Sequence, residues 1–171
     1  GKTGRETVRF AVNTARADGK EPGAHARLRM VHKTPAGTYL VCCAGAAAVR
    51  EYGADGRLVW EQAVPALAFD ARRRANGNTL VAHLTGVTEY TPDHRAVWSF
   101  ACADAPALNL AFLCGIQERA NGNLVVGTWA NGAPDATRAT AFEVTRDKRI
   151  VWAHFPAQDR NMMTVQRPPL K

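Results

Sequence analysis

"RRRANGNTLVAHLTGVTEYTPDHRAVW", residues 72–98, recurs in similar form further along the chain, as QERANGNLVVG at 117–127 and AFEVTRDKRIVW at 141–152. An earlier version reads TPAGTYLV at 34–41 and AVREYGADGRLVW at 48–60. Gly37, Gly77 and Gly122 mark the same point in the three copies and stand 40 and 45 residues apart. A repeat of this length predicts an architecture in which one supersecondary unit is used several times.

Each copy carries the signals of four short strands. Ala-Gly or Asn-Gly marks a first tight turn, since such turns need residues that tolerate positive φ. A second polar turn (ADGR, PDHR or RDKR) separates an alternating strand from a run that ends in Val-Trp. No segment shows a sustained 3.6-residue apolar period, so helix is not needed anywhere. We predict an all-β fold, a single β-propeller segment over residues 1–171 with four-stranded blades at about 27–62, 67–100 and 110–155.

Both ends of the chain extend this pattern. ETVRFAVNT, residues 6–14, is expected to be the last strand of an earlier blade, and residues 161–167 the first strand of a later one. Three blades and two flanking strands form a partial propeller, because propellers usually have about four to eight blades. The sequence leaves three explanations open: a fragment, a half-ring that pairs with a second copy, or a trimmed product. Exposed blade edges favour self-association or completion by missing blades.

Tryptophan closes each copy, at Trp60, Trp98 and Trp152. Three large rings at matching positions are expected to pack between blades, with ligand stacking as the alternative.

Composition and charge exclude several classes. Hydrophobic residues make up 46% of the 171, and the net charge is +7. No apolar run is long enough to span a membrane, and no secretion leader is visible in this chain. Arginine outnumbers lysine seventeen to five but is scattered, and only Arg72-Arg73-Arg74 form a run. Nucleic acid is therefore not an expected partner; the basic surface serves either solubility or attraction of anions.

Four cysteines, Cys42, Cys43, Cys102 and Cys114, are too few for a disulfide scaffold. Cys42 and Cys43 are neighbours on an expected strand and would face opposite sides. Buried free thiols, a ring disulfide between these two, and a bridge from Cys102 to Cys114 all remain open.

The repeats quoted above resemble a broad group of bacterial propellers. The group includes arylsulfotransferase-like proteins, quinoprotein-like (PQQ-like) repeat proteins and uncharacterised periplasmic or surface propellers, and the likeness covers about residues 5–167. It implies a periplasmic or cell-surface location. The sulfuryl-accepting histidine of arylsulfotransferases has no motif match among the five histidines here. Cys42-Cys43 is similar to the adjacent cysteines of quinone-dependent dehydrogenases, but the residues that would hold calcium and quinone are absent. No cofactor and no metal are expected.

Two sets of residues are candidates for a binding site. The first lies in the long connections, which should share one face of the disc and where binding residues tend to gather; it comprises His25, Asn109, Trp129 and Arg138. The second lies on the innermost strands, five positions before each marker glycine; it comprises His32, Arg72 and Gln117. Two positions earlier stand Met30, Asp70 and Gly115. The inner set could line a basic channel for an anion or form a structural hydrogen-bond network.

The leading hypothesis is a non-catalytic scaffold that binds a small anionic or carbohydrate-like ligand, or a protein. The alternative is an arylsulfotransferase-like or quinoprotein-like enzyme with a basic central channel. No catalytic residue is assigned, because no Ser-His-Asp order, phosphate loop or metal-ligand spacing appears.

Overall fold

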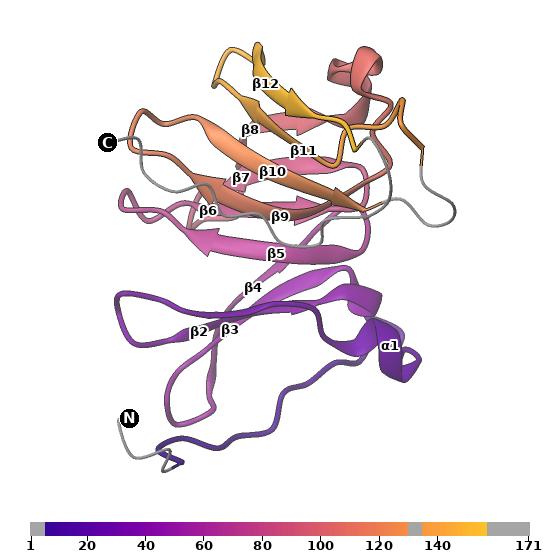
Figure 1. Cartoon of the computed structure of the whole chain (residues 1–171). Coiled ribbons are helices and arrows are strands. Elements are labelled where there is room, and N and C mark those ends of the chain that lie inside the picture. The colour runs from indigo at the N-terminus through magenta and orange to yellow at the C-terminus, as the bar shows by residue number, and fades with distance from the viewer. Residues whose placement is uncertain (1–5, 130–134, 157–171) are drawn as a thin grey trace.

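Three four-stranded antiparallel sheets make up the fold (Figure 1). The computed structural model describes residues 6–129 and 135–156. The blades are β1 (Val31–Lys33), β2 (Tyr39–Cys43), β3 (Ala48–Tyr52), β4 (Leu58–Ala63); β5 (Ala68–Arg73), β6 (Thr79–His83), β7 (Gly86–Tyr90), β8 (Ala96–Ala101); and β9 (Phe112–Glu118), β10 (Leu124–Trp129), β11 (Ala141–Val144), β12 (Ile150–His154). In each, the strands pair in chain order, so the predicted all-β partial propeller is confirmed.

Tight hairpins join the strands at one face of the disc, on the left in Figure 1. Gly37, Gly77 and Gly122 have φ of 87°, 86° and 82°, which places them in the left-handed region that favours glycine. The opposite face carries α1 (Ala24–Arg27) and the 3₁₀ turns η1 (Ala44–Ala46), η2 (Cys102–Asp104) and η3 (Pro106–Leu108). We call this second side the loop face.

Apolar side chains fill the space between successive blades. The layer between the first and second blades contains Leu40, Cys42, Val49, Val64, Ala68, Ala71, Val81 and Tyr90. The layer between the second and third blades is larger and includes the tilted ring pair Phe100 and Phe142, with centroids 5.3 Å apart. Because one sheet cannot bury both of its faces alone, the repetition in the sequence is what allows a core to form.

Tryptophans bind one blade to the next. The indole N–H of Trp60 donates to the carbonyl of Pro92 in the second blade (3.1 Å), and that of Trp98 donates to the carbonyl of Arg146 in the third (2.7 Å). His94 stacks on Trp60 with ring centroids 5.7 Å apart, and the Arg146 guanidinium lies 4.1 Å from the centroid of Trp98. The expected packing of these two rings between blades is therefore confirmed.

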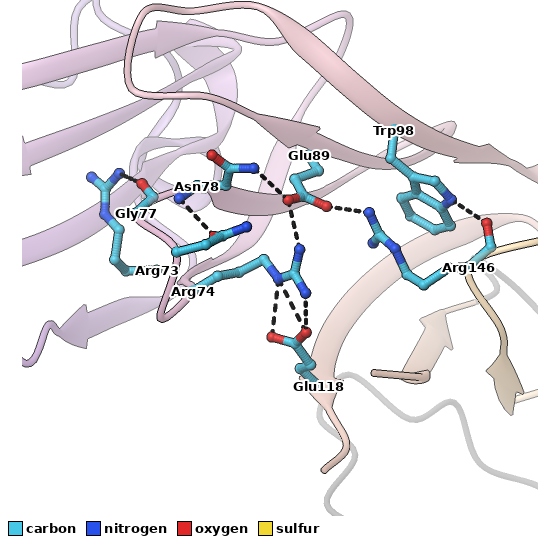
Figure 2. Close-up of polar contacts among 9 residues, drawn as sticks. Arg73, Arg74, Gly77, Asn78, Glu89, Trp98, Glu118 and Arg146 are labelled. Carbon is cyan, nitrogen blue, oxygen red and sulfur yellow. Dashed lines mark hydrogen bonds and ion pairs between the residues drawn. The ribbon is translucent and has the colours of Figure 1, made fainter. Parts of the chain in front are cut away.

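A buried glutamate ties the second blade to the third (Figure 2). Glu89 accepts hydrogen bonds from Arg74 and Asn78, both at 2.6 Å, and from Arg146. Arg74 also donates to Glu118 of the third blade (3.0 Å). Burial alone would raise the pKa of Glu89, but the hydrogen bonds from Asn78 and Arg74 and the charge of Arg146 outweigh it and lower that pKa.

The flanking strand expected at residues 6–14 is not formed, because this segment pairs with no other strand. It crosses the outer face of the first blade instead, where Phe10 stacks on Tyr52 with ring centroids 5.5 Å apart. Arg50 donates to the carbonyls of Asn13 (2.6 Å) and Ala15 (3.1 Å). Side chains of the first blade thus satisfy backbone groups that a neighbouring strand would otherwise bind. The other expected flank, 161–167, lies outside the described residues.

The four cysteines are free thiols. Cys42 faces the second blade and Cys43 faces the outer side, as alternation along a strand predicts. Burial raises the pKa of both thiols. Among the described residues, no helix is long and apolar enough to cross a membrane.

Replacing Glu89 by Gln should lower the free energy of unfolding by about 3 kcal/mol, because partly buried Arg146 loses its counter-charge and Arg74 keeps only that of Glu118. Urea denaturation at neutral pH measures the change. The folded-state pKa of Glu89 is lowered, so its contribution is fully present above the unfolded value of about 4.3 and is lost as the pH falls through the folded value. Stability of the Glu89→Gln variant should therefore depend less on pH below about 4.3 than that of the wild type.

The matched control is Asp93→Asn, which removes the same charge from an exposed turn where Asp93 pairs with Arg95. Its urea midpoint should stay near that of the wild type. Equal midpoints for Glu89→Gln and Asp93→Asn would contradict the role assigned to Glu89.

Candidate functional site

One carboxylate joins all three blades at their inner strands. Asp70, on β5, has a relative exposure of 1%. One of its oxygens lies 2.7 Å from Nε2 of His32 on β1, and the other accepts from Nε of Arg72 (3.3 Å) and from the backbone N–H of Ile116 on β9 (3.0 Å). We call Asp70, His32 and Arg72 the inner cluster. Its two basic side chains remain partly exposed, at 21% for His32 and 35% for Arg72.

Strand register sets the side of each inner strand on which these residues lie. Asp70 and Arg72 are two positions apart on β5 and therefore share one side of that strand. His32 stands in the same row of the first blade as Leu40 and Trp60, which face the second blade. Adjacent inner strands thus bring an imidazole and a carboxylate into contact across 38 residues of sequence.

Gln117 does not join the inner cluster. It lies on β9 beside Ile116, whose side chain is in the core between the second and third blades. Alternation along the strand turns Gln117 toward the other side of the third blade, in register with Val125. Of the three residues that stand five positions before the marker glycines, His32 and Arg72 therefore belong to one site, and Gln117 faces elsewhere.

Asn109 and Arg138 do come together on the loop face. The Asn109 amide donates to Asp135 (3.2 Å) and Thr137 (3.1 Å), and Arg138 donates to the Asn109 carbonyl (3.1 Å). Hydrogen bonds from Thr137 lower the pKa of Asp135. These groups largely satisfy one another, so the structure gives them a role in holding η3 against the segment that follows Asp135.

The remaining loop-face candidates lie in different surroundings. His25 is exposed on α1, with Nε2 3.4 Å from Arg29. Trp129 ends β10 and packs on Phe112, with ring centroids 5.3 Å apart. The sequence placed Asp70 on an inner strand without making it a candidate site residue, and it did not single out Arg29. A carboxylate inside the otherwise apolar run AFDA, residues 68–71, was the available signal for Asp70.

The inner cluster offers hydrogen-bond donors and an imidazole, but no metal site. In the described ranges, no group of His, Cys, Asp and Glu side chains is arranged to hold a metal ion. Because an ionised carboxylate only accepts, His32 Nε2 carries the proton of the bond to Asp70. Across the described part of the chain, neither terminal nitrogen of Arg72 has a hydrogen-bond partner.

Comparisons with known proteins support the fold. No protein-family model and no curated protein matches the chain. The chain is similar to the solved structure of a protein of unknown function from Bacteroides caccae, with a TM-score of 0.73 and 23% identity over 84% of this chain and 56% of that one. It is also similar to virginiamycin B lyase from Staphylococcus aureus, with a TM-score of 0.56 and 13% identity over 84% of this chain and 47% of the lyase.

A third similar structure is the extracellular domain of a protein described as a hybrid two-component system from B. thetaiotaomicron, with a TM-score of 0.51 and 17% identity over 75% and 17% of the two chains. At these identities the likeness shows the β-propeller fold alone. The chain spans about half the length of the first two structures, at 56% and 47%. The resemblance to arylsulfotransferase-like and quinoprotein-like proteins gains no support from sequence comparison.

Asp70→Asn should lower the free energy of unfolding by about 3 kcal/mol, because an amide cannot balance the charges that the buried carboxylate meets. Imidazole nitrogen NMR provides a local readout. The wild type should show His32 with its proton on Nε2, and Asp70→Asn should change that signal while leaving the signal of buried His83, which binds Thr88, in place. An unchanged His32 spectrum would contradict the assigned geometry.

Proposed function

We propose that this chain is part of a binding propeller whose inner cluster holds a small anion, such as a sulfate, a phosphate or a carboxylate. The observation that carries the proposal is the buried Asp70 carboxylate, which fixes Arg72 through one nitrogen and leaves its two terminal nitrogens unpaired within the described residues. A guanidinium held by one edge presents a fork that matches two oxygens of an anion.

Charge and access support this assignment. Arg72 and His32 contact one carboxylate between them, and Arg72 is 35% exposed, so an anion can reach it without the inner strands separating. The net charge of +7 favours the approach of anions through long-range attraction. Other arginines, such as Arg74 and Arg146, already form ion pairs with Glu89 or Glu118. Arg72 is therefore the best supported anion donor at the inner strands.

A second candidate function is enzymatic, and the His32–Asp70 pair is the observation that favours it. A buried carboxylate that fixes one imidazole nitrogen positions the ring for proton transfer or nucleophilic attack. Incubation with an aryl sulfate followed by intact-mass measurement tests the arylsulfotransferase-like alternative. Transfer of the sulfuryl group from the phenolic oxygen to His32 would release a phenolate and add the mass of one sulfuryl group; an unchanged mass supports the binding function.

We place the protein outside the cytoplasm. The support is that the similar B. thetaiotaomicron structure is an extracellular domain, together with the resemblance to periplasmic and surface propellers. Fractionation of the source cells tests this, and recovery with cytosolic enzymes alone would overturn it.

A sulfate titration at constant ionic strength, monitored by amide NMR, tests the proposed function. Sulfate should shift the Ile116 amide signal in a saturable manner, because this amide binds the same carboxylate as Arg72. Arg72→Gln should weaken binding by about tenfold or more, since a charge-assisted hydrogen bond is worth about 1.5–3 kcal/mol.

Arg95→Gln is the matched control, since Arg95 is 72% exposed on a hairpin turn and pairs only with Asp93 among charged groups of the described residues. It removes the same charge and should leave sulfate binding unchanged. If the two variants lose equal affinity, or if sulfate shifts surface signals without Ile116, the inner cluster is not the anion site.

A further inference from the structure

The inner strands of the second and third blades, β5 and β9, change register at the same point of the repeat. In β5 the pairing passes from Ala68 with His83 to Asp70 with Ala82, so Phe69 is the extra residue of a bulge. In β9 the pairing skips Cys114 in the same way. Phe69 and Cys114 stand eight positions before their marker glycines, and Arg29 holds that position in the first blade. Bulges redirect side chains, so these equivalent positions are where the inner strands turn residues toward one another.

These side chains converge on a row of aromatic rings. The guanidinium of Arg29 lies 5.3 Å from the centroid of Phe69. Phe69 stacks on Phe112 with ring centroids 6.3 Å apart and an interplanar angle of 18°, and Phe112 contacts Trp129 at 5.3 Å. We call Phe69, Phe112 and Trp129 the aromatic array. Phe69 is buried at 3% exposure, whereas Phe112 and Trp129 are partly exposed.

Arg29 has an unmet hydrogen-bonding requirement beside this array. Its Nε is buried and has no hydrogen-bond partner. Its Nη1 lies 3.4 Å from Nε2 of His25. Within residues 6–129 and 135–156, no carboxylate pairs with Arg29. Leaving a buried charged donor unsatisfied costs more than leaving a neutral one, so Arg29 keeps hydrogen-bonding capacity that the described residues do not use.

We propose that the aromatic array and Arg29 form a second binding site, at the loop-face end of the inner strands, for a flat ring that carries a carboxylate. The partly exposed faces of Phe112 and Trp129 stack on the ring, and Arg29 binds the carboxylate. A carboxylate attached directly to an arene lies near the plane of the ring, so a single flat ligand can make both contacts. The site uses no residue of the inner cluster and does not depend on the anion assigned there.

Benzoate is the probe, with acetate and benzyl alcohol as analogues that lack the ring or the charge. In amide and indole NMR, benzoate should shift the Trp129 indole signal and bind more tightly than either analogue. Arg29→Gln should weaken benzoate binding by about tenfold or more. Arg27→Gln is the matched control, since Arg27 lies on α1, is 51% exposed and meets Glu21; it should bind benzoate as the wild type does.

Benzoate binding no tighter than that of both analogues would overturn the proposal, as would equal binding by the Arg29 and Arg27 variants. If Arg29→Gln does not fold, Trp129→Leu decides: its benzoate affinity should fall toward that of acetate, and an unchanged affinity refutes the site. The sulfate response of Ile116 separates the two proposals. If benzoate binds but sulfate does not shift Ile116, the aromatic site stands and the inner-cluster function fails. If sulfate shifts Ile116 but benzoate does not bind, the inner-cluster function stands and the aromatic site fails.

Discussion

The burial of one charge, on Asp70, is the constraint on which the inner end of the molecule depends. A carboxylate at 1% exposure is tolerated only where donors surround it, and no single blade supplies enough of them. His32, Arg72 and the Ile116 amide come from three different inner strands. Satisfying Asp70 therefore fixes the relative positions of β1, β5 and β9. The same geometry holds Arg72 with its terminal nitrogens directed away from that contact.

Away from the inner cluster, a tryptophan and a glutamate of one blade contact the next blade, and this happens at both blade interfaces. Trp60 and Trp98 each donate to a carbonyl in the hairpin between the last two strands of the next blade. Glu51 and Glu89 each receive an arginine from the next blade, Arg73 in one case and Arg146 in the other. Such contacts between neighbours let a repeat be extended without a central core shared by all blades. The tryptophans and glutamates stand at equivalent positions of the repeat, whereas Arg73 lies on β5 and Arg146 in the turn between β11 and β12.

Features set by local chemistry could be predicted from the sequence, and those set by contacts between blades could not. The glycine turns and the four-strand units follow from φ requirements and short-range alternation, which a single copy of the repeat displays. The prediction for residues 6–14 was wrong because an apolar alternating segment can also pack on a sheet face through Phe10 without pairing as a strand. Gln117 was grouped with His32 and Arg72 by position, but its strand neighbour Ile116 contributes the backbone donor instead.

The chemistry of this propeller lies where its copies differ. Met30, Asp70 and Gly115 occupy one position of the repeat, yet only Asp70 can organise an imidazole and a guanidinium. Arg29, Phe69 and Cys114 occupy another; Phe69 and Cys114 are the extra residues of two bulges, and the Arg29 guanidinium lies against the Phe69 ring. Identical copies would place three like groups at each level, and three buried carboxylates would repel one another. Divergence at these two positions is therefore what allows a repeated scaffold to carry distinct sites, while the turns and tryptophans that hold it together stay the same.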